Sequence, residues 1–156
     1  MKTLILSSIM TMSFMASSLA QAGVSSRIYQ QYADDEDVLS MSLNYDLIDI
    51  LDLDIDVDDQ LRHLSGDVYQ VKFLAFGDEA AASKTLKAID RELAGSSLEL
   101  LEIPAKAEDE DFRLLKFYGY KKGGYYSDVC MLLLSDDGET GVFIAVYGKI
   151  KIRRAS

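Results

Sequence analysis

Aspartates at every second position are the first candidates for chemistry in this chain. The segment DLDIDVD alternates apolar residues with four aspartates, namely Asp52, Asp54, Asp56 and Asp58. Carboxylate oxygens suit Ca²⁺, but they must converge to about 2.3–2.6 Å from the ion. Alternate positions of an extended strand lie about 7 Å apart instead. The pattern therefore predicts a solvated acidic face, with weak divalent-cation contact at these four residues as the alternative.

An EF-hand calcium loop would need more than alternating carboxylates. It requires a glycine at its sixth position and a bidentate glutamate at its twelfth. Counted from Asp52, these positions hold Val57 and His63. The chain also contains no glycine-rich nucleotide-binding motif of the G-x-G-x-x-G or Walker type. We therefore predict no dedicated metal ligands and no cofactor.

Nucleophilic catalysis has one candidate pair, His63 and Cys130, which are the only histidine and the only cysteine. A thiol activated by an imidazole is a recognised nucleophile. However, Cys130 lies in the apolar run VCMLLL, which is typical of a buried small hydrophobic residue. No G-x-S-x-G motif is present either. The sequence therefore predicts no catalytic residues and a protein that is not an enzyme.

Aromatic and basic residues gather in the stretch FYGYKKGGYY. Tyrosine beside lysine can stack on sugars, peptides or bases. Tyrosine is also common in half-buried strands, so a plain tyrosine-rich hairpin is the competing interpretation. The candidate contacts for a protein partner are Tyr118, Tyr120, Lys121, Lys122, Tyr125 and Tyr126.

The charge and the N-terminus bound where and how the protein acts. The net charge of −10 argues against nucleic acid and anionic lipid as partners. Residues 1–22 are predicted to be a signal peptide, with Lys2, an apolar run and the small-x-small end Ala20-Gln21-Ala22. Because polar residues interrupt the run, no membrane span is expected after cleavage. We predict a soluble, exported protein of the periplasm or the extracellular space.

Hydrophobic periodicity predicts the elements that must position these residues. Residues 23–37 read as a flexible acidic segment with a short helix at most, and residues 38–156 as a single α+β domain. The expected helices are 44–51, 59–65 (ended by Gly66) and a long one at about 79–94. The expected extended segments are 38–43, 52–58, 69–76, 112–120, 125–134 and 141–152. The last three form an antiparallel meander, and the helices pack on one face of the sheet.

The C-terminal segment KIKIRR mirrors the acidic segment in charge. Lys149, Lys151 and Arg153 alternate with isoleucines. One hypothesis is that this last strand lies near the acidic segment, with Asp54 opposite Lys151. Opposite charges directly across two strands contribute about 0.2–1 kcal/mol per pair. The alternative is an edge strand that its lysines protect from aggregation.

Three pieces of the chain carry a family resemblance: VLSMSLNYDLIDIL, LRHLSGDVYQVKFLAF and the tail FRLLKFYGYKKGGYYSDVCMLLLSDDGETGVFIAVYGKIKI. Together with the export signal, their order resembles an uncharacterised group of small exported bacterial proteins, domain of unknown function 4252. The resemblance implies an exported protein of α+β architecture. It brings no catalytic residues, and the Asp-rich middle departs from the family pattern.

These features together favour a non-enzymatic exported protein that acts by protein–protein binding in the periplasm or cell envelope. The alternative function is binding of a small ligand or a divalent cation by the Asp-rich segment 46–59.

Overall fold

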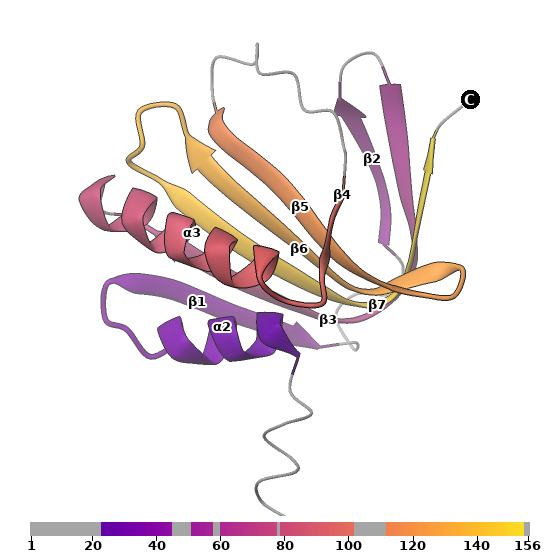
Figure 1. Ribbon diagram of the computed structural model, residues 1–156, viewed down its shortest axis with the longest axis horizontal. Coiled ribbons are helices and arrows are strands. Elements are labelled where there is room, and N and C mark those ends of the chain that lie inside the picture. Colours follow the sequence, from indigo (N-terminus) through magenta and orange to yellow (C-terminus); the bar gives the residue numbers. More distant parts are fainter. Residues whose placement is uncertain (1–22, 45–50, 58–59, 78, 102–111, 155–156) are drawn as a thin grey trace, which may run out of the picture.

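The computed structural model describes residues 23–44, 51–57, 60–77, 79–101 and 112–154. Two helices and seven strands lie in these ranges (Figure 1). The helices are α2 (Val24–Tyr32) and α3 (Glu79–Ala94). The strands are β1 (Val38–Asn44), β2 (Leu51–Val57), β3 (Gln60–Phe76), β4 (Glu99–Leu101), β5 (Phe112–Lys122), β6 (Tyr125–Ser135) and β7 (Gly141–Arg154).

All described strands belong to one antiparallel sheet. The order is β1-β3-β7-β6-β5-β4, and β2 also pairs with β3. β1 pairs with residues 70–76 of β3, whereas β2 pairs with residues 60–66. β7 lies along the opposite edge of β3, so β1 and β2 follow one another along the same edge. The α+β class predicted from the sequence is confirmed.

Helix α3 covers one face of this sheet. Its apolar residues recur at helical spacing, and Ala82, Leu86, Ile89 and Leu93 are at most 1% exposed. They form a single core with sheet residues such as Phe143, which is fully buried. Neither of the two described helices is long and apolar enough to cross a membrane.

Helix α2 lies within residues 23–37, for which the sequence predicts a flexible segment with a short helix at most. Ile28 on this helix is fully buried in the core that α3 forms with the sheet. The ring of Tyr32 packs edge-on against that of Phe76, with 5.7 Å between the centroids. Val24, Ile28 and Tyr32 are four residues apart, so one side of the helix is apolar. The domain therefore begins before Val38.

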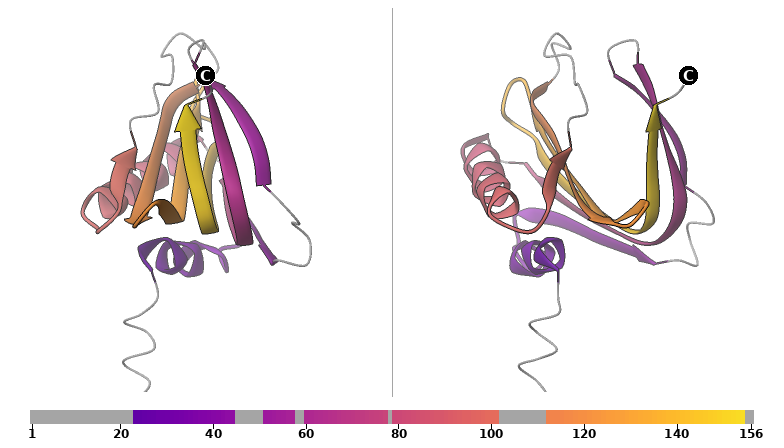
Figure 2. Two further views of the ribbon diagram at one scale, coloured as in Figure 1. Left: turned by 90° about the vertical axis from the view of Figure 1, so that its right-hand side faces the viewer. Right: turned by 45° about the vertical axis from the view of Figure 1, so that its right-hand side comes forward.

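The other face of the sheet is also apolar. Phe117, Val129 and Val68 are buried there, in two smaller clusters separate from the core beneath the helices. The sheet is bent like a trough, and both described helices lie against its outer side (Figure 2). The strands of the meander are therefore apolar on both faces, as central strands commonly are.

The predicted helix over 59–65 is wrong, because β3 is extended from Gln60 to Phe76. This strand pairs with β2 on one edge and β7 on the other, and two flanking ladders outweigh local helical spacing. The extended segment predicted over 52–58 is confirmed for residues 52–57, which belong to β2. The two end residues of the helix predicted over 44–51 lie in strands instead, Asn44 in β1 and Leu51 in β2, and residues 45–50 lie outside the described residues.

The hypothesis that Asp54 lies directly opposite Lys151 is also wrong. β3 separates the two strands: Asp54 is in register with His63, and Ser65 is in register with Lys151. The edge-strand alternative fits only the end of β7. The described pairing with β6 stops at Ile150, while the pairing with β3 continues to Arg154.

Irregularities in the strand register occur at neighbouring positions on adjacent strands. Tyr69 and Ser127 have no partner in the β3–β7 and β6–β7 registers, and the β5–β6 register shifts after Tyr120. A β-bulge bends its strand, increases the local twist and re-aims side chains. Figure 2 shows that the sheet bends sharply. The aligned irregularities therefore give the sheet its bend.

Candidate functional site

A pocket of about 430 Å³ opens at the bend of the sheet. The strand residues of its lining come from β3, β5, β6 and β7. The start of α2 and the segment after α3 close the pocket from the other side. The lining residues are Gly23, Val24, Tyr69, Ser97, Leu98, Tyr120, Lys122, Ser127, Asp128 and Tyr147. We call this the tyrosine pocket.

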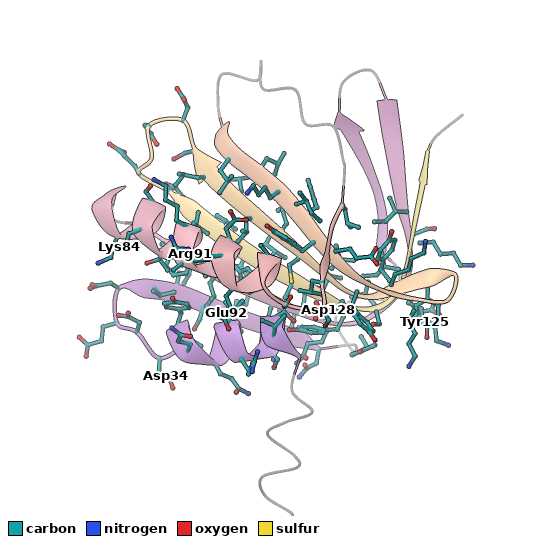
Figure 3. The ribbon with its side chains drawn as sticks, viewed as in Figure 1. Asp34, Lys84, Arg91, Glu92, Tyr125 and Asp128 are labelled. Carbon is teal, nitrogen blue, oxygen red and sulfur yellow. The ribbon has the colours of Figure 1, made fainter. Side chains whose placement is uncertain are left out.

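Beneath the pocket, Ser25 of α2 joins two strands through its hydroxyl group. Ser25 is fully buried, and its Oγ donates a hydrogen bond of 2.6 Å to Oδ2 of Asp128 on β6. The hydroxyl of Tyr147 on β7 lies 2.9 Å from the same Oγ. A serine hydroxyl carries one proton, so Tyr147 must be the donor in this second bond. Asp128 lies where the start of α2 meets the sheet (Figure 3).

Two further groups surround the Asp128 carboxylate. The Cys130 thiol donates to Oδ1 of Asp128 over 3.6 Å. The Lys72 ammonium donates to Oγ of Ser26 over 2.8 Å. Its nitrogen also lies 5.1 Å from the ring centroid of Tyr29 and 5.4 Å from that of Tyr147. Both rings are within the range of a cation–π interaction.

The electrostatics of the cluster are set mainly by burial. Burial raises the pKa of Asp128, although hydrogen bonds from Ser25 and Cys130 and the charge of Lys72 oppose this. Burial also raises the pKa of Tyr147, which keeps its hydroxyl protonated. The pKa of Lys72 is lowered by burial, against the attraction of Asp128. The net effect disfavours the ionised form of each group.

This arrangement does not activate a nucleophile. Burial raises the pKa of Cys130 well above its ordinary value, and the nearby Asp128 carboxylate raises it further. A thiol must ionise to react, so burial lowers the reactivity of Cys130 in the folded protein. Lys72 of β3 is in register with Ala145 of β7, which is in register with Cys130. His63 lies nine residues along β3 from Lys72, which is about 30 Å of extended strand.

Asp128 predicts a specific pH dependence of stability in the uncleaved chain. Because its pKa is raised on folding, the unfolded state loses the proton at a lower pH than the folded state does. The contribution of Asp128 to the free energy of unfolding is complete below the ordinary aspartate pKa. It is lost as the pH rises through the raised pKa of the folded state. Asp128→Asn removes this loss. Thermal unfolding should therefore show a mutant-minus-wild-type difference in Tm that is more positive at pH 7 than at pH 4.

Asp34→Asn is the matched control for this experiment, because Asp34 is an exposed carboxylate on the segment after α2 (Figure 3). Its Tm difference should change little between the two pH values. A difference for Asp128→Asn that stays constant from pH 4 to pH 7 would contradict the raised pKa.

The structure separates the residues predicted to contact a partner. Tyr120 and Lys122 line the tyrosine pocket, and Lys121 is exposed beside them. Tyr125 and Tyr126 are half-buried at the start of β6, and Tyr125 lies at the hairpin in Figure 3. Contact between these residues and a partner stays a prediction.

Tyr118 has a different role from its neighbours in the sequence. It is 3% exposed, and its hydroxyl donates to Oδ1 of Asp90 on α3 over 2.5 Å. Lys116 forms an ion pair of 2.7 Å with the other oxygen of this carboxylate. Burial and the Asp90 carboxylate raise the pKa of Tyr118, so it remains a hydrogen-bond donor. Tyr118 therefore fastens α3 to β5 and is not available to a partner.

The acidic candidates are only partly described. Asp52, Asp54 and Asp56 occupy alternate positions of β2, as the pattern predicted. Their side chains and the whole of Asp58 lie outside the described part. Among the described side chains, no group of three or more histidine, cysteine, aspartate or glutamate residues is arranged to hold a metal ion. Weak cation contact at these aspartates stays a prediction.

Sequence reasoning missed Ser25, Tyr69, Asp128 and Tyr147. One of them had a readable signal. Asp128 shares its phase along β6 with the core residues Cys130 and Leu132, so alternation places it on the buried side. A carboxylate on a buried phase is a candidate for a functional site. Tyr69 had no such signal, because a bulge in the pairing of β3 and β7 decides where it points.

Comparison with known families gives one match. The family model described as Domain of unknown function (DUF4252) matches residues 29–156. This range contains Tyr69, Asp128 and Tyr147 but begins after Gly23 and Ser25. Comparisons with curated proteins and with solved structures find no match.

Proposed function

The chain belongs to the family Domain of unknown function (DUF4252), and from this premise we propose that it is an exported, non-enzymatic binding protein. It acts in the periplasm or cell envelope by holding a protein partner at the tyrosine pocket. The carrying observation is that tyrosines from three different strands meet at this pocket beside a mostly buried carboxylate.

Exposed aromatic area supports a binding role. Tyr69 is 54% exposed and Tyr120 is 43% exposed, although both are large amphipathic side chains. Tyrosine is enriched among the residues that dominate binding energy at protein interfaces. It offers a wide contact area, a hydroxyl group and few rotatable bonds. A side chain of the partner would therefore insert between these rings.

The chemistry beneath the pocket supports a role without catalysis. Ser25 is fully buried and already donates to Asp128, so its oxygen is not offered to a substrate. The raised pKa of Cys130 keeps the only thiol protonated. These groups hold the wall of the pocket in place, which is what a preorganised binding site requires.

Site-specific crosslinking tests the proposed binding surface. A photo-reactive phenylalanine analogue at position 120 should form a discrete protein adduct in envelope preparations, because Tyr120 lies at the pocket. Excess purified wild-type protein should abolish the adduct. Once the partner is purified, Tyr120→Ala should weaken its binding at least tenfold, since a central aromatic hot spot contributes about 2 kcal/mol or more.

Position 39 provides the matched control. Leu39 is a large apolar residue that is 65% exposed, and it pairs with Ala75, six residues along β3 from Tyr69. The same analogue at position 39 should give no competed adduct. Equal labelling at positions 39 and 120, or labelling that wild-type protein does not compete, would exclude the tyrosine pocket as the contact.

A small ligand is the second candidate for the same pocket. Its volume of about 430 Å³ lies within the usual range for small-molecule sites, which is about 300–1,000 Å³. A bound molecule that co-purifies with wild-type protein and is lost with Tyr120→Ala would favour this function. The alternative function of binding a divalent cation depends on the segment 46–59. An unchanged Tm in millimolar calcium would exclude this function.

A further inference from the structure

Gly23 lies against the Asp128 carboxylate, at the wall of the tyrosine pocket. A Cβ atom built on Gly23 would be 3.5 Å from Oδ2 of Asp128 and 4.0 Å from Oγ of Ser25. The Gly23 nitrogen is about 2.5 Å from that Cβ position by ordinary bond geometry. It therefore lies within about 6 Å of the carboxylate oxygen, and rotation about one backbone bond changes this distance.

Asp128 has hydrogen-bond donors but no cation in contact. Among the described residues, Ser25 and Cys130 donate to its two oxygens, and Lys72 acts on it only through its charge. The Lys72 ammonium is held instead by Ser26 and two tyrosine rings. A mostly buried carboxylate is expected to have a paired cation.

The sequence places a cleavage motif directly before Gly23. Ala20 and Ala22 are the small residues that signal peptidase selects, and Gly23 would be the first residue of the product. In this cleavage, water adds across the Ala22–Gly23 peptide bond. Ala22 keeps the new carboxylate, and the Gly23 nitrogen becomes a free amine that takes up a proton.

We propose that this cleavage creates an α-ammonium group on Gly23 that pairs with the Asp128 carboxylate and completes the buried network of Ser25 and Tyr147. The inference uses the export part of the proposed function and does not depend on the partner. Gly23 and Val24 also line the tyrosine pocket, so the pairing sets part of its wall. The finished binding site would then exist only in the processed protein.

The helix dipole near Gly23 also favours pairing of the new ammonium group with a carboxylate. A new ammonium at the first residue lies at the positive end of the α2 dipole, which is unfavourable without a counter-charge. Among the described residues, Asp128 supplies a carboxylate in reach of this position. The side chain of Gly23 is a hydrogen atom, so nothing on this residue separates its amine from Oδ2.

The first test is the identity of the processed end. The full-length chain is expressed in a bacterial host that exports it, and the intact mass of the exported protein is measured. We expect the mass of residues 23–156. Any other first residue would overturn the proposal.

The second test measures the pairing itself on protein that begins at Gly23. The pKa of the α-amino group, followed by ¹⁵N chemical shift of Gly23, should rise by about one unit above its ordinary range of roughly 7.7–8.0. N-terminal acetylation should lower the Tm of wild-type protein by about 2–8 °C and change that of Asp128→Asn much less. An α-amino pKa in the ordinary range would overturn the pairing, and this readout needs no variant that might fail to fold.

Asp128→Asn also distinguishes processed from uncleaved protein by sign. In the uncleaved chain this change should be neutral or stabilising at pH 7, because it removes an unpaired buried charge. In protein that begins at Gly23 it should be destabilising, because it removes a paired one. The same sign in both forms would contradict the proposal. Failure of crosslinking at position 120 would leave these results unaffected, so the two proposals can fail separately.

Discussion

Replacing Gly66 or Gly148 with alanine is expected to lower the free energy of unfolding by about 3 kcal/mol. A Cβ on Gly66 would lie 2.0 Å from the carbonyl oxygen of Lys149, and one on Gly148 would lie 2.1 Å from that of Asp67. Both oxygens belong to backbone, so neither can move aside without opening the β3–β7 ladder. Gly66 also has φ of +153°, which other residues rarely adopt.

Urea unfolding measures this effect as a fall in the transition midpoint. Gly124→Ala is the control, because nothing lies within 4 Å of its built Cβ and its φ is not positive. We expect the control to remain within about 0.5 kcal/mol of wild type. Insoluble Gly66→Ala beside soluble Gly124→Ala would agree with the prediction. Equal midpoints for the two variants would mean that β3 and β7 do not approach so closely.

The same glycines explain where sequence reasoning about the fold failed. Gly66 follows QLRHLS, whose leucines at positions 61 and 64 are three residues apart, and this spacing favours a short helix that ends at Gly66. Its actual role is to let β7 approach β3 closely, a long-range contact that leaves no local trace. Strong local hydrophobic periodicity predicts the fold class more successfully. The α+β class follows from one amphipathic helical stretch and several alternating or apolar runs.

The pocket was less accessible to sequence reasoning than the fold was. Tyr120 and Lys122 were found because aromatic and basic residues cluster there in the chain. Tyr69 and Tyr147 come from strands that become neighbours only in the folded sheet, and Tyr69 falls at the register shift between β3 and β7. Bulges depend on how two strands pair, so a single sequence does not display them.

Ser25 was missed for a different reason. The segment after Gly23 is polar on average, which favours a flexible segment with a short helix at most. Its apolar residues Val24, Ile28 and Tyr32 are few, but they share one side of a helix. Ser25 lies next to this stripe and is buried with it. The mean polarity of the segment therefore misses the helical spacing of its apolar residues, which indicates an amphipathic helix.

Ile28→Ala is the second change with a large expected effect. Ile28 has no solvent-accessible surface and packs in the main core, so truncating its side chain should leave a cavity. We expect a loss of about 2–4 kcal/mol in the free energy of unfolding, the usual range for isoleucine in a core. Urea unfolding measures the loss. Gln31→Ala, at an exposed position of the same helix, should stay within about 0.5 kcal/mol of wild type.

The same variant tests whether α2 holds the candidate site closed. Cys130 is the only cysteine, is fully buried and shares the Asp128 carboxylate with Ser25 of α2. Loosening α2 should raise the population of locally opened molecules, because local stability follows buried contacts. Thiol labelling under native conditions should then be faster for Ile28→Ala than for Gln31→Ala. Equal labelling rates would show that Cys130 is shielded by other elements and that α2 can detach without opening the site.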